Sequence, residues 1–125
     1  MERDLSGDWA GQYVYPDTAE AVFFSARLFE NAGRFIGCIE EDDALEGRLS
    51  ASVDGRRSGP NVRFTKFYEQ GSDDFDMVTY EGVLSADGSE IEGRWTVPNN
   101  WSGRFLMVRS SEQDAEIGRA RTERV

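Results

Sequence analysis

Lysine, glutamate and tyrosine side chains are the groups of this chain that are suited to chemistry. The sequence contains no histidine, so it lacks the most common general base near neutral pH and the usual ligand of zinc and haem. Catalytic triads and histidine-ligated metals are therefore excluded. An enzyme built from this chain would have to use Lys66, Glu41 and the tyrosines for acid–base work.

Lys66 has the most demanding position among these groups, because its place in an alternating strand points it inward. An inward ammonium is costly unless it is paired. Lys66 should therefore meet Glu41, an anionic group of a ligand, or solvent reached by extension of its stem. Glu40 and Glu41 are adjacent in a strand and therefore point to opposite faces. This separation prevents the two carboxylates from acting as an acid–base pair. Cys38 shares the outward face with Ile36, and no histidine is present to activate it as a nucleophile.

Eight runs of alternating apolar and polar residues would position these side chains as strands. They cover residues 9–15, 21–30, 34–41, 44–54, 61–68, 77–84, 90–97 and 103–110. No segment between them shows a helical period. The sequences Asn31-Ala32-Gly33-Arg34 and Ala86-Asp87-Gly88-Ser89 suit two-residue hairpin turns with glycine at positive φ. The second turn would place Gly82 opposite Gly93.

Short connections between successive strands predict a meander, and closure of the meander into a barrel removes its exposed edges. Glycines recur at inward positions, where strong strand bending or an internal cavity requires short side chains. They are Gly11, Gly37, Gly47, Gly82, Gly93 and Gly103. We therefore predict an all-β fold, an eight-stranded antiparallel up-and-down β-barrel, over residues 1–110. The charged tail, residues 111–125, is expected to be a short helix or disordered.

Length and charge narrow the class of protein. A chain of 125 residues fits one domain. The net charge of −10 argues against nucleic acid and acidic membranes as partners. No apolar run approaches the roughly 18 residues of a membrane span. The charged start and the single cysteine, Cys38, predict a cytoplasmic protein without an internal disulfide. We expect no cofactor.

The segment Leu5-Ser6-Gly7-Asp8-Trp9 resembles the Gly-x-Trp signature that opens the first strand in the calycin superfamily, which comprises lipocalins, fatty-acid-binding proteins and avidins. In that superfamily an arginine that ends the last strand packs across the tryptophan at the closed base of the barrel. Arg109 stands at the matching position, so the resemblance implies a structural contact between Trp9 and Arg109, of the cation–π kind.

The length of the chain is most similar to that of avidin-like barrels, because the sequence has no helical lid between its strands. The segment Trp101-Ser102-Gly103-Arg104-Phe105 is also similar to an avidin strand opening. The biotin pocket is not implied, since Ala10, Gly11 and Gln12 replace the asparagine and serine expected after the first tryptophan.

The end of the barrel opposite Trp9 is the predicted mouth, where the loops 16–20, 42–43, 69–76 and 98–102 meet. These loops are acidic and contain no lysine or arginine, which favours cationic ligands. Inward positions near the mouth combine aromatic walls with a few polar groups, as small-ligand sites do. These candidate ligand-binding residues are Tyr13, Tyr15, Phe24, Glu41, Lys66, Tyr68, Tyr80, Trp95 and Phe105. The alternative is a filled core whose tyrosine hydroxyls reach water at the rim.

Three functions remain open from the sequence. The preferred one is non-catalytic binding of a small, mainly apolar or aromatic molecule inside the barrel. The second is an interaction protein with a packed core, and the third is a barrel enzyme that uses Lys66, Glu41 and tyrosines. Outward apolar residues on strands 103–110, 9–15, 21–30 and 34–41, which are contiguous after closure, predict a homo-oligomer. They are Val14, Phe23, Phe29, Ile36, Cys38, Leu106 and Val108.

Overall fold

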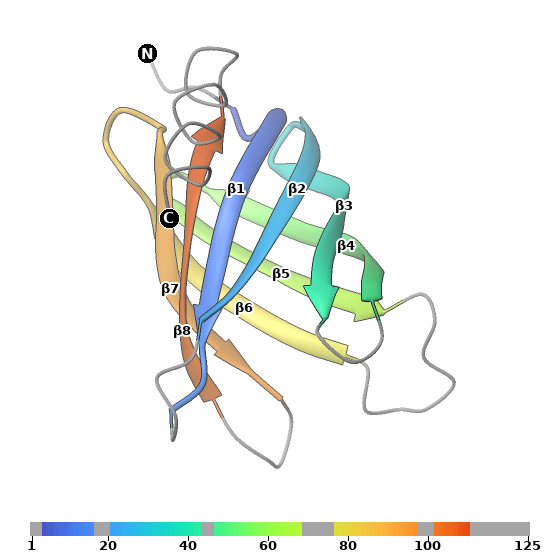
Figure 1. The fold of residues 1–125 in the computed structure, drawn as a ribbon. Coiled ribbons are helices and arrows are strands. Elements are labelled where there is room, and N and C mark those ends of the chain that lie inside the picture. Colours follow the sequence, from blue (N-terminus) through green and yellow to red (C-terminus); the bar gives the residue numbers. More distant parts are fainter. Residues whose placement is uncertain (1–3, 17–20, 44–46, 69–76, 98–101, 111–125) are drawn as a thin grey trace.

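A computed structural model of the chain describes residues 4–16, 21–43, 47–68, 77–97 and 102–110, without the side chains of residues 42–43 and 47–48. Eight antiparallel strands, each paired with the next, close into a barrel through pairing of the first with the last (Figure 1). They are β1 (Gly7–Val14), β2 (Ala21–Asn31), β3 (Arg34–Asp43), β4 (Gly47–Ser58), β5 (Asn61–Tyr68), β6 (Met77–Leu84), β7 (Glu90–Thr96) and β8 (Ser102–Ser110). The predicted meander barrel is confirmed. The described residues include no helix long and apolar enough to cross a membrane.

The register of the hairpins follows the turn sequences. Ala32 and Gly33 both have positive φ, 54° and 83°, as a two-residue turn of this kind requires. Gly82 lies opposite Gly93, as expected. The inward residues of each strand therefore face one common core.

The fourth strand differs from its prediction, which ended it at residue 54. It continues to Ser58, which pairs with Asn61. The glycine and arginines of residues 55–58 resemble a turn in sequence. In the structure Gly55 and Arg56 pair with both neighbouring strands, Arg57 and Ser58 pair with β5, and Arg34 lies opposite Arg56. The predicted start at residue 44 lies outside the described residues.

The β6–β7 turn is also longer than predicted, although its register is unchanged. Pairing ends with the hydrogen bond from Ser85 N–H to the Glu90 carbonyl oxygen, 2.8 Å. The Asp87 carboxylate accepts hydrogen bonds from the Ser85 hydroxyl, 2.8 Å, and from the Ser89 hydroxyl and N–H, 2.6 and 3.0 Å. These serine hydroxyls stabilise a four-residue loop, 86–89. The position of the glycine alone had predicted a two-residue turn.

Aromatic rings fill the middle of the barrel. Phe64 stacks on Tyr80 with ring centroids 4.6 Å apart, and Tyr80 meets the edge of Phe105 at 4.9 Å. A Cβ atom at Gly93 would overlap the backbone of Glu81 and Gly82. The absence of a side chain at Gly93 therefore allows two strands to approach closely. The reason for a glycine at this position is strand packing and not an internal cavity.

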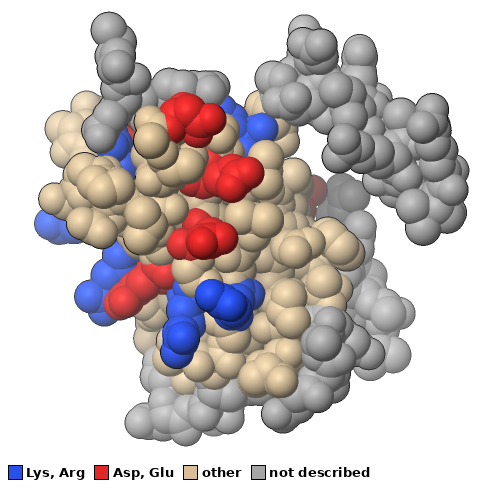
Figure 2. Space-filling view, turned by 90° about the vertical axis from the view of Figure 1, so that its left-hand side faces the viewer, with Lys and Arg blue, Asp and Glu red and all other residues tan. Residues whose placement is uncertain are grey.

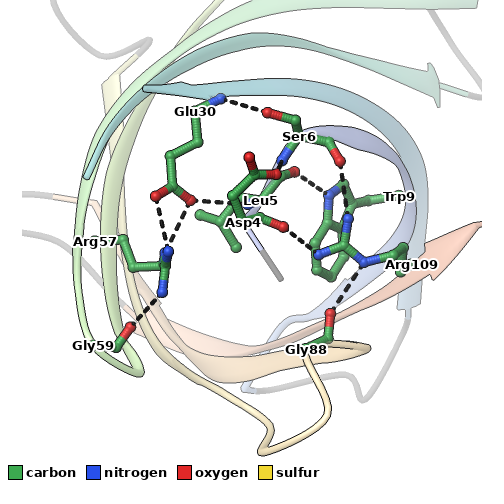
Figure 3. A network of polar contacts seen from close by, with 9 residues as sticks. All are labelled: Asp4, Leu5, Ser6, Trp9, Glu30, Arg57, Gly59, Gly88 and Arg109. Atoms are coloured by element: carbon green, nitrogen blue, oxygen red, sulfur yellow. Dashed lines mark hydrogen bonds and ion pairs between the residues drawn. The ribbon is translucent and has the colours of Figure 1, made fainter. Parts of the chain in front are cut away.

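Trp9 and Arg109 close one end of the barrel (Figure 3). Trp9 is 1% exposed, and the Arg109 guanidinium lies 4.4 Å from the centroid of its ring. Arg109 donates hydrogen bonds to the carbonyl oxygens of Asp4, Ser6 and Gly88, at 2.6, 2.9 and 3.1 Å. The contact that the family resemblance implied is present, and it ties the segment before β1 across the closed end.

A second polar contact at the closed end was not foreseen. The Glu30 carboxylate accepts hydrogen bonds from Arg57 Nε and Nη2, both at 2.9 Å, and from Leu5 N–H at 2.8 Å. Burial alone would raise the pKa of Glu30, but these hydrogen bonds and the arginine charge lower it. If the predicted fourth strand had been continued beyond residue 54, its alternation would have placed Arg57 on the inward face.

Candidate functional site

Four polar side chains meet inside the barrel, toward the mouth: Tyr13 on β1, Glu41 on β3, and Lys66 and Tyr68 on β5. Lys66 Nζ donates to Glu41 Oε2 and to the Tyr68 hydroxyl, both at 2.7 Å. Glu41 also accepts from the hydroxyls of Tyr13 at 2.7 Å and Tyr68 at 2.9 Å. Because β1, β3 and β5 do not pair with one another, the contacts of Glu41 with Tyr13, Lys66 and Tyr68 form within the lumen, whereas Lys66 and Tyr68 belong to the same strand. We call these four residues the mouth cluster.

The ion pair of the mouth cluster is deeply enclosed. Lys66 is 1% exposed and Glu41 is 4% exposed. The ammonium also faces the rings of Tyr68, Tyr13 and Tyr80, with centroids 4.5, 4.8 and 5.4 Å away, and each such face attracts a cation. Of the three partners expected for Lys66, the structure shows Glu41. The expectation that Lys66 extends into solvent is wrong, because the side chain is buried. The Tyr13 and Tyr68 hydroxyls donate hydrogen bonds to Glu41.

Burial sets the protonation of the cluster. Removal from water lowers the pKa of the Lys66 ammonium, and the charge of Glu41 opposes that shift. Burial raises the pKa of the Tyr13, Tyr68 and Tyr80 phenols above their usual value. These phenols therefore stay protonated at neutral pH and serve as hydrogen-bond donors. An ammonium has three N–H donors, and Lys66 uses two of them for Glu41 and Tyr68.

Aromatic side chains surround the cluster on its β1 and β7 side. The Tyr13 ring lies edge-on to Tyr15 and Trp95, with centroids 5.7 and 5.9 Å apart, and Phe24 lies 6.2 Å away. Trp95 Nε1 donates to the Val14 carbonyl oxygen at 3.2 Å. The rings are thus held at fixed positions by one another and by the backbone.

The nine predicted site residues are all buried or half-buried. The mouth cluster and Tyr80 come together around the ammonium, Tyr15, Phe24 and Trp95 form the aromatic wall, and Phe105 packs deeper against Tyr80. Sequence reasoning missed Phe64, which stacks on Tyr80, although its parity with Lys66 on β5 could have identified it. Most of the predicted acidic mouth, in 17–20, 69–76 and 98–101, lies outside the described residues. A ligand-contacting role for all of these residues stays a prediction.

Comparisons with known proteins identify the architecture. Neither a family model nor a curated protein matches the sequence. Among solved structures, the chain is similar to a de novo designed fluorescence-activating β-barrel, with 13% sequence identity and a TM-score of 0.63. The match covers 84% of this chain and 93% of the designed one. The chain has the fold of an eight-stranded antiparallel β-barrel. At this identity, the likeness concerns the fold alone.

Proposed function

We propose that the barrel binds a small, mainly apolar or aromatic molecule at the mouth cluster, without catalysing a reaction. The observation that carries the proposal is the Lys66–Glu41 ion pair, 2.7 Å long and almost fully buried in an aromatic interior. Apolar residues of similar volume often stabilise a core as well as a buried ion pair does. A few polar groups among aromatic walls are instead typical of small-ligand sites.

The arrangement suggests how such a molecule would be held. Its aromatic part would pack against Tyr13, Tyr15 and Trp95, and a polar group would accept a hydrogen bond from the third N–H of Lys66. The protonated phenols favour binding over acid–base chemistry, because they can donate hydrogen bonds but do not act as bases. The similar designed barrel is described as fluorescence-activating, which fits a ligand inside this architecture.

We further propose that the barrel is calycin-like. Support comes from the closed end, where the tryptophan of the Gly-x-Trp segment lies under the Arg109 guanidinium. In this proposal the closed end is structural and the opposite end receives the ligand. The two roles are separated along the barrel axis.

Two matched probes test the binding proposal. N-phenyl-1-naphthylamine is neutral, and 1-anilinonaphthalene-8-sulfonate adds an anionic group to nearly the same aromatic skeleton. We expect both to bind the intact chain saturably, with increased probe fluorescence. Lys66→Met should weaken the sulfonate by about 1.5–3 kcal/mol, the value of a charged hydrogen bond, and change the neutral probe by less than about twofold.

A second variant guards against a folding defect. Lys66→Met alone leaves the Glu41 charge buried and unpaired, which destabilises a protein strongly. The double variant Glu41→Gln/Lys66→Met removes both charges and should retain the fold and the binding of the neutral probe. Equal weakening of both probes would discard Lys66 as an anchor. Failure of the intact chain to bind either probe would refute the proposed function.

A specific surface observation favours a second candidate function, self-association. Phe23, Phe29 and Ile36 are 67%, 59% and 56% exposed, and Phe29 lies directly opposite Ile36. Monomeric proteins rarely expose many large apolar side chains on one side, and we propose that a second copy of the chain covers the outward faces of β2 and β3, which carry these three residues. Light scattering should then show a dimer or larger assembly that Phe23→Asp dissociates. A monomer at high concentration would contradict this candidate.

A further inference from the structure

The outer surface carries a row of arginines that the interior site does not use. Cross-strand pairing places one outward, exposed residue of six successive strands in a continuous line. The residues are Arg34, Arg56, Arg63, Glu81, Arg94 and Arg104, and we call this line the arginine row. The concentration of basic residues contrasts with a chain that has 24 acidic and 14 basic residues.

At the β3–β5 end of the arginine row, three arginines lie opposite one another in succession. Like charges directly opposite each other destabilise a sheet, and Arg56 lies between Arg34 and Arg63. The flanking arginines reach carboxylates, Arg34 with Asp54 at 3.7 Å and Arg63 with Glu81 at 3.4 Å, in exposed pairs. Within the described part of the chain, Arg56 has no such partner. An external anion would relieve this repulsion.

A hollow of about 670 Å³ lies over this part of the row. Its lining includes Arg34, Arg56 and Arg63, the polar residues Ser58 and Asn61, and the acidic Glu81, which forms the exposed pair with Arg63. Neighbouring strands lie about 4.8 Å apart, so one ligand with several charges can reach more than one guanidinium. Arg57 also borders the hollow, but its guanidinium holds Glu30 inside the closed end.

The other end of the row provides a contrast. Arg94 and Arg104 border a separate hollow of about 450 Å³ that also contains Glu92. Figure 2 shows the side of the molecule on which β7 lies in Figure 1, where acidic and basic side chains occur close together. Apart from Arg57, the first hollow has three arginines from successive strands and one glutamate, Glu81, whereas the second has two arginines and one glutamate. The first hollow therefore has the larger local excess of positive charge.

We propose that the first hollow binds a small polyanion, a molecule with two or more phosphate or carboxylate groups, through Arg34, Arg56 and Arg63. The planar guanidinium binds both groups in a bidentate manner. The net charge of −10 favours a small ligand over a long polyanion. Repulsion from distant charges is screened beyond about 8 Å at physiological salt, and a small ligand meets mainly the local arginines. The row faces outward, so this site is independent of the proposed interior site.

Calorimetric titration with tripolyphosphate and with citrate tests the site and distinguishes phosphate from carboxylate ligands. We expect saturable binding of at least one probe that weakens as salt is added. Arg56→Gln should reduce the affinity about tenfold, in keeping with loss of a charge-assisted hydrogen bond. Arg104→Gln is the matched control, because it removes one exposed arginine of the same row outside the hollow. It should change the affinity by less than about twofold.

Three results would overturn the proposal. The first is no saturable binding of either probe to the intact chain. The second is an equal loss in Arg56→Gln and Arg104→Gln, which would indicate a general charge effect. The third is dissociation of an oligomer by Arg56→Gln without probe binding, which would make the row an interface between copies. Binding of N-phenyl-1-naphthylamine should be unchanged in Arg56→Gln, so failure of this site is distinguishable from failure of the interior site.

Discussion

Among single residues, the position of Lys66 was predictable from the sequence, but its partner was not. Strand alternation correctly predicted an inward ammonium and named Glu41 among three possible partners. The choice could not be made from sequence, because pairing registers relate adjacent strands and the contact joins β3 to β5 across the lumen. The tyrosines complete the environment by donating to Glu41 and by facing the ammonium.

The buried phenols predict a distinct response to alkali. The folded-state pKa values of Tyr13, Tyr68 and Tyr80 lie above the usual value of 10.0, first because burial disfavours the charged phenolate. Above pH 10 the unfolded chain releases phenol protons that the folded chain keeps, so the free energy of unfolding should decrease as the pH rises. Below pH 10 these groups should not contribute to the pH dependence.

Absorbance at 295 nm, which reports phenolate formation, measures this response. For these three tyrosines the absorbance should rise together with the loss of near-ultraviolet circular dichroism, in one unfolding transition. Tyr13→Phe should reduce the amplitude of that joint step without introducing a new one. Ionisation of all the tyrosines near pH 10 in a chain that is still folded would contradict the observed burial.

At the scale of elements, turn sequences and period-two alternation were sufficient for the strand order and for most of the register. Gly82 was correctly placed opposite Gly93 although the turn is longer than predicted, because a two-residue and a four-residue loop centred on the same residues give the same register. The fourth strand was misjudged because Gly55 and two following arginines resemble a turn. Arg57 is satisfied by Glu30, a distant partner that no local pattern reveals.

Close strand approach at Gly93 predicts a selective cost of side chains. Gly93→Ala should destabilise the barrel by about 1–3 kcal/mol, as overpacking does, because the new Cβ would overlap the backbone of β6. Gly59→Ala is the comparison, because no atom lies within 4 Å of its Cβ position, although its φ of 58° adds backbone strain. Urea denaturation gives both values. A smaller cost at Gly93 than at Gly59 would mean that the strands can separate without penalty.

At the scale of the whole molecule, the two ends of the barrel differ in construction. The closed end is tied by Trp9, Arg109 and the Glu30–Arg57 pair, whereas the mouth half contains an ion pair within aromatic rings. The closed-end contact was predictable because the family resemblance specified both partners. The outer arginine row was not predicted, because its residues are far apart in the sequence. They become neighbours only when the registers of six paired strands are known.

The closed end should contribute strongly to stability. Trp9→Ala should reduce the free energy of unfolding by about 3–5 kcal/mol, the usual cost of removing a large buried aromatic side chain. The substitution would also remove the hydrogen bond from Trp9 Nε1 to the Leu5 carbonyl oxygen, 2.9 Å long. Denaturant unfolding followed by circular dichroism measures this change. A loss below about 1 kcal/mol would show that the closed end is not a stability centre.

A ligand at the proposed interior site would contact the mouth cluster. The most direct test is a two-dimensional ¹H–¹⁵N NMR titration of the intact chain with N-phenyl-1-naphthylamine. We expect saturable shifts of the backbone amides of Tyr13, Glu41 and Lys66, with little change at Trp9 and Arg109. Shifts confined to the outward Phe23 and Phe29 region, or no saturable shifts, would contradict binding at the mouth cluster.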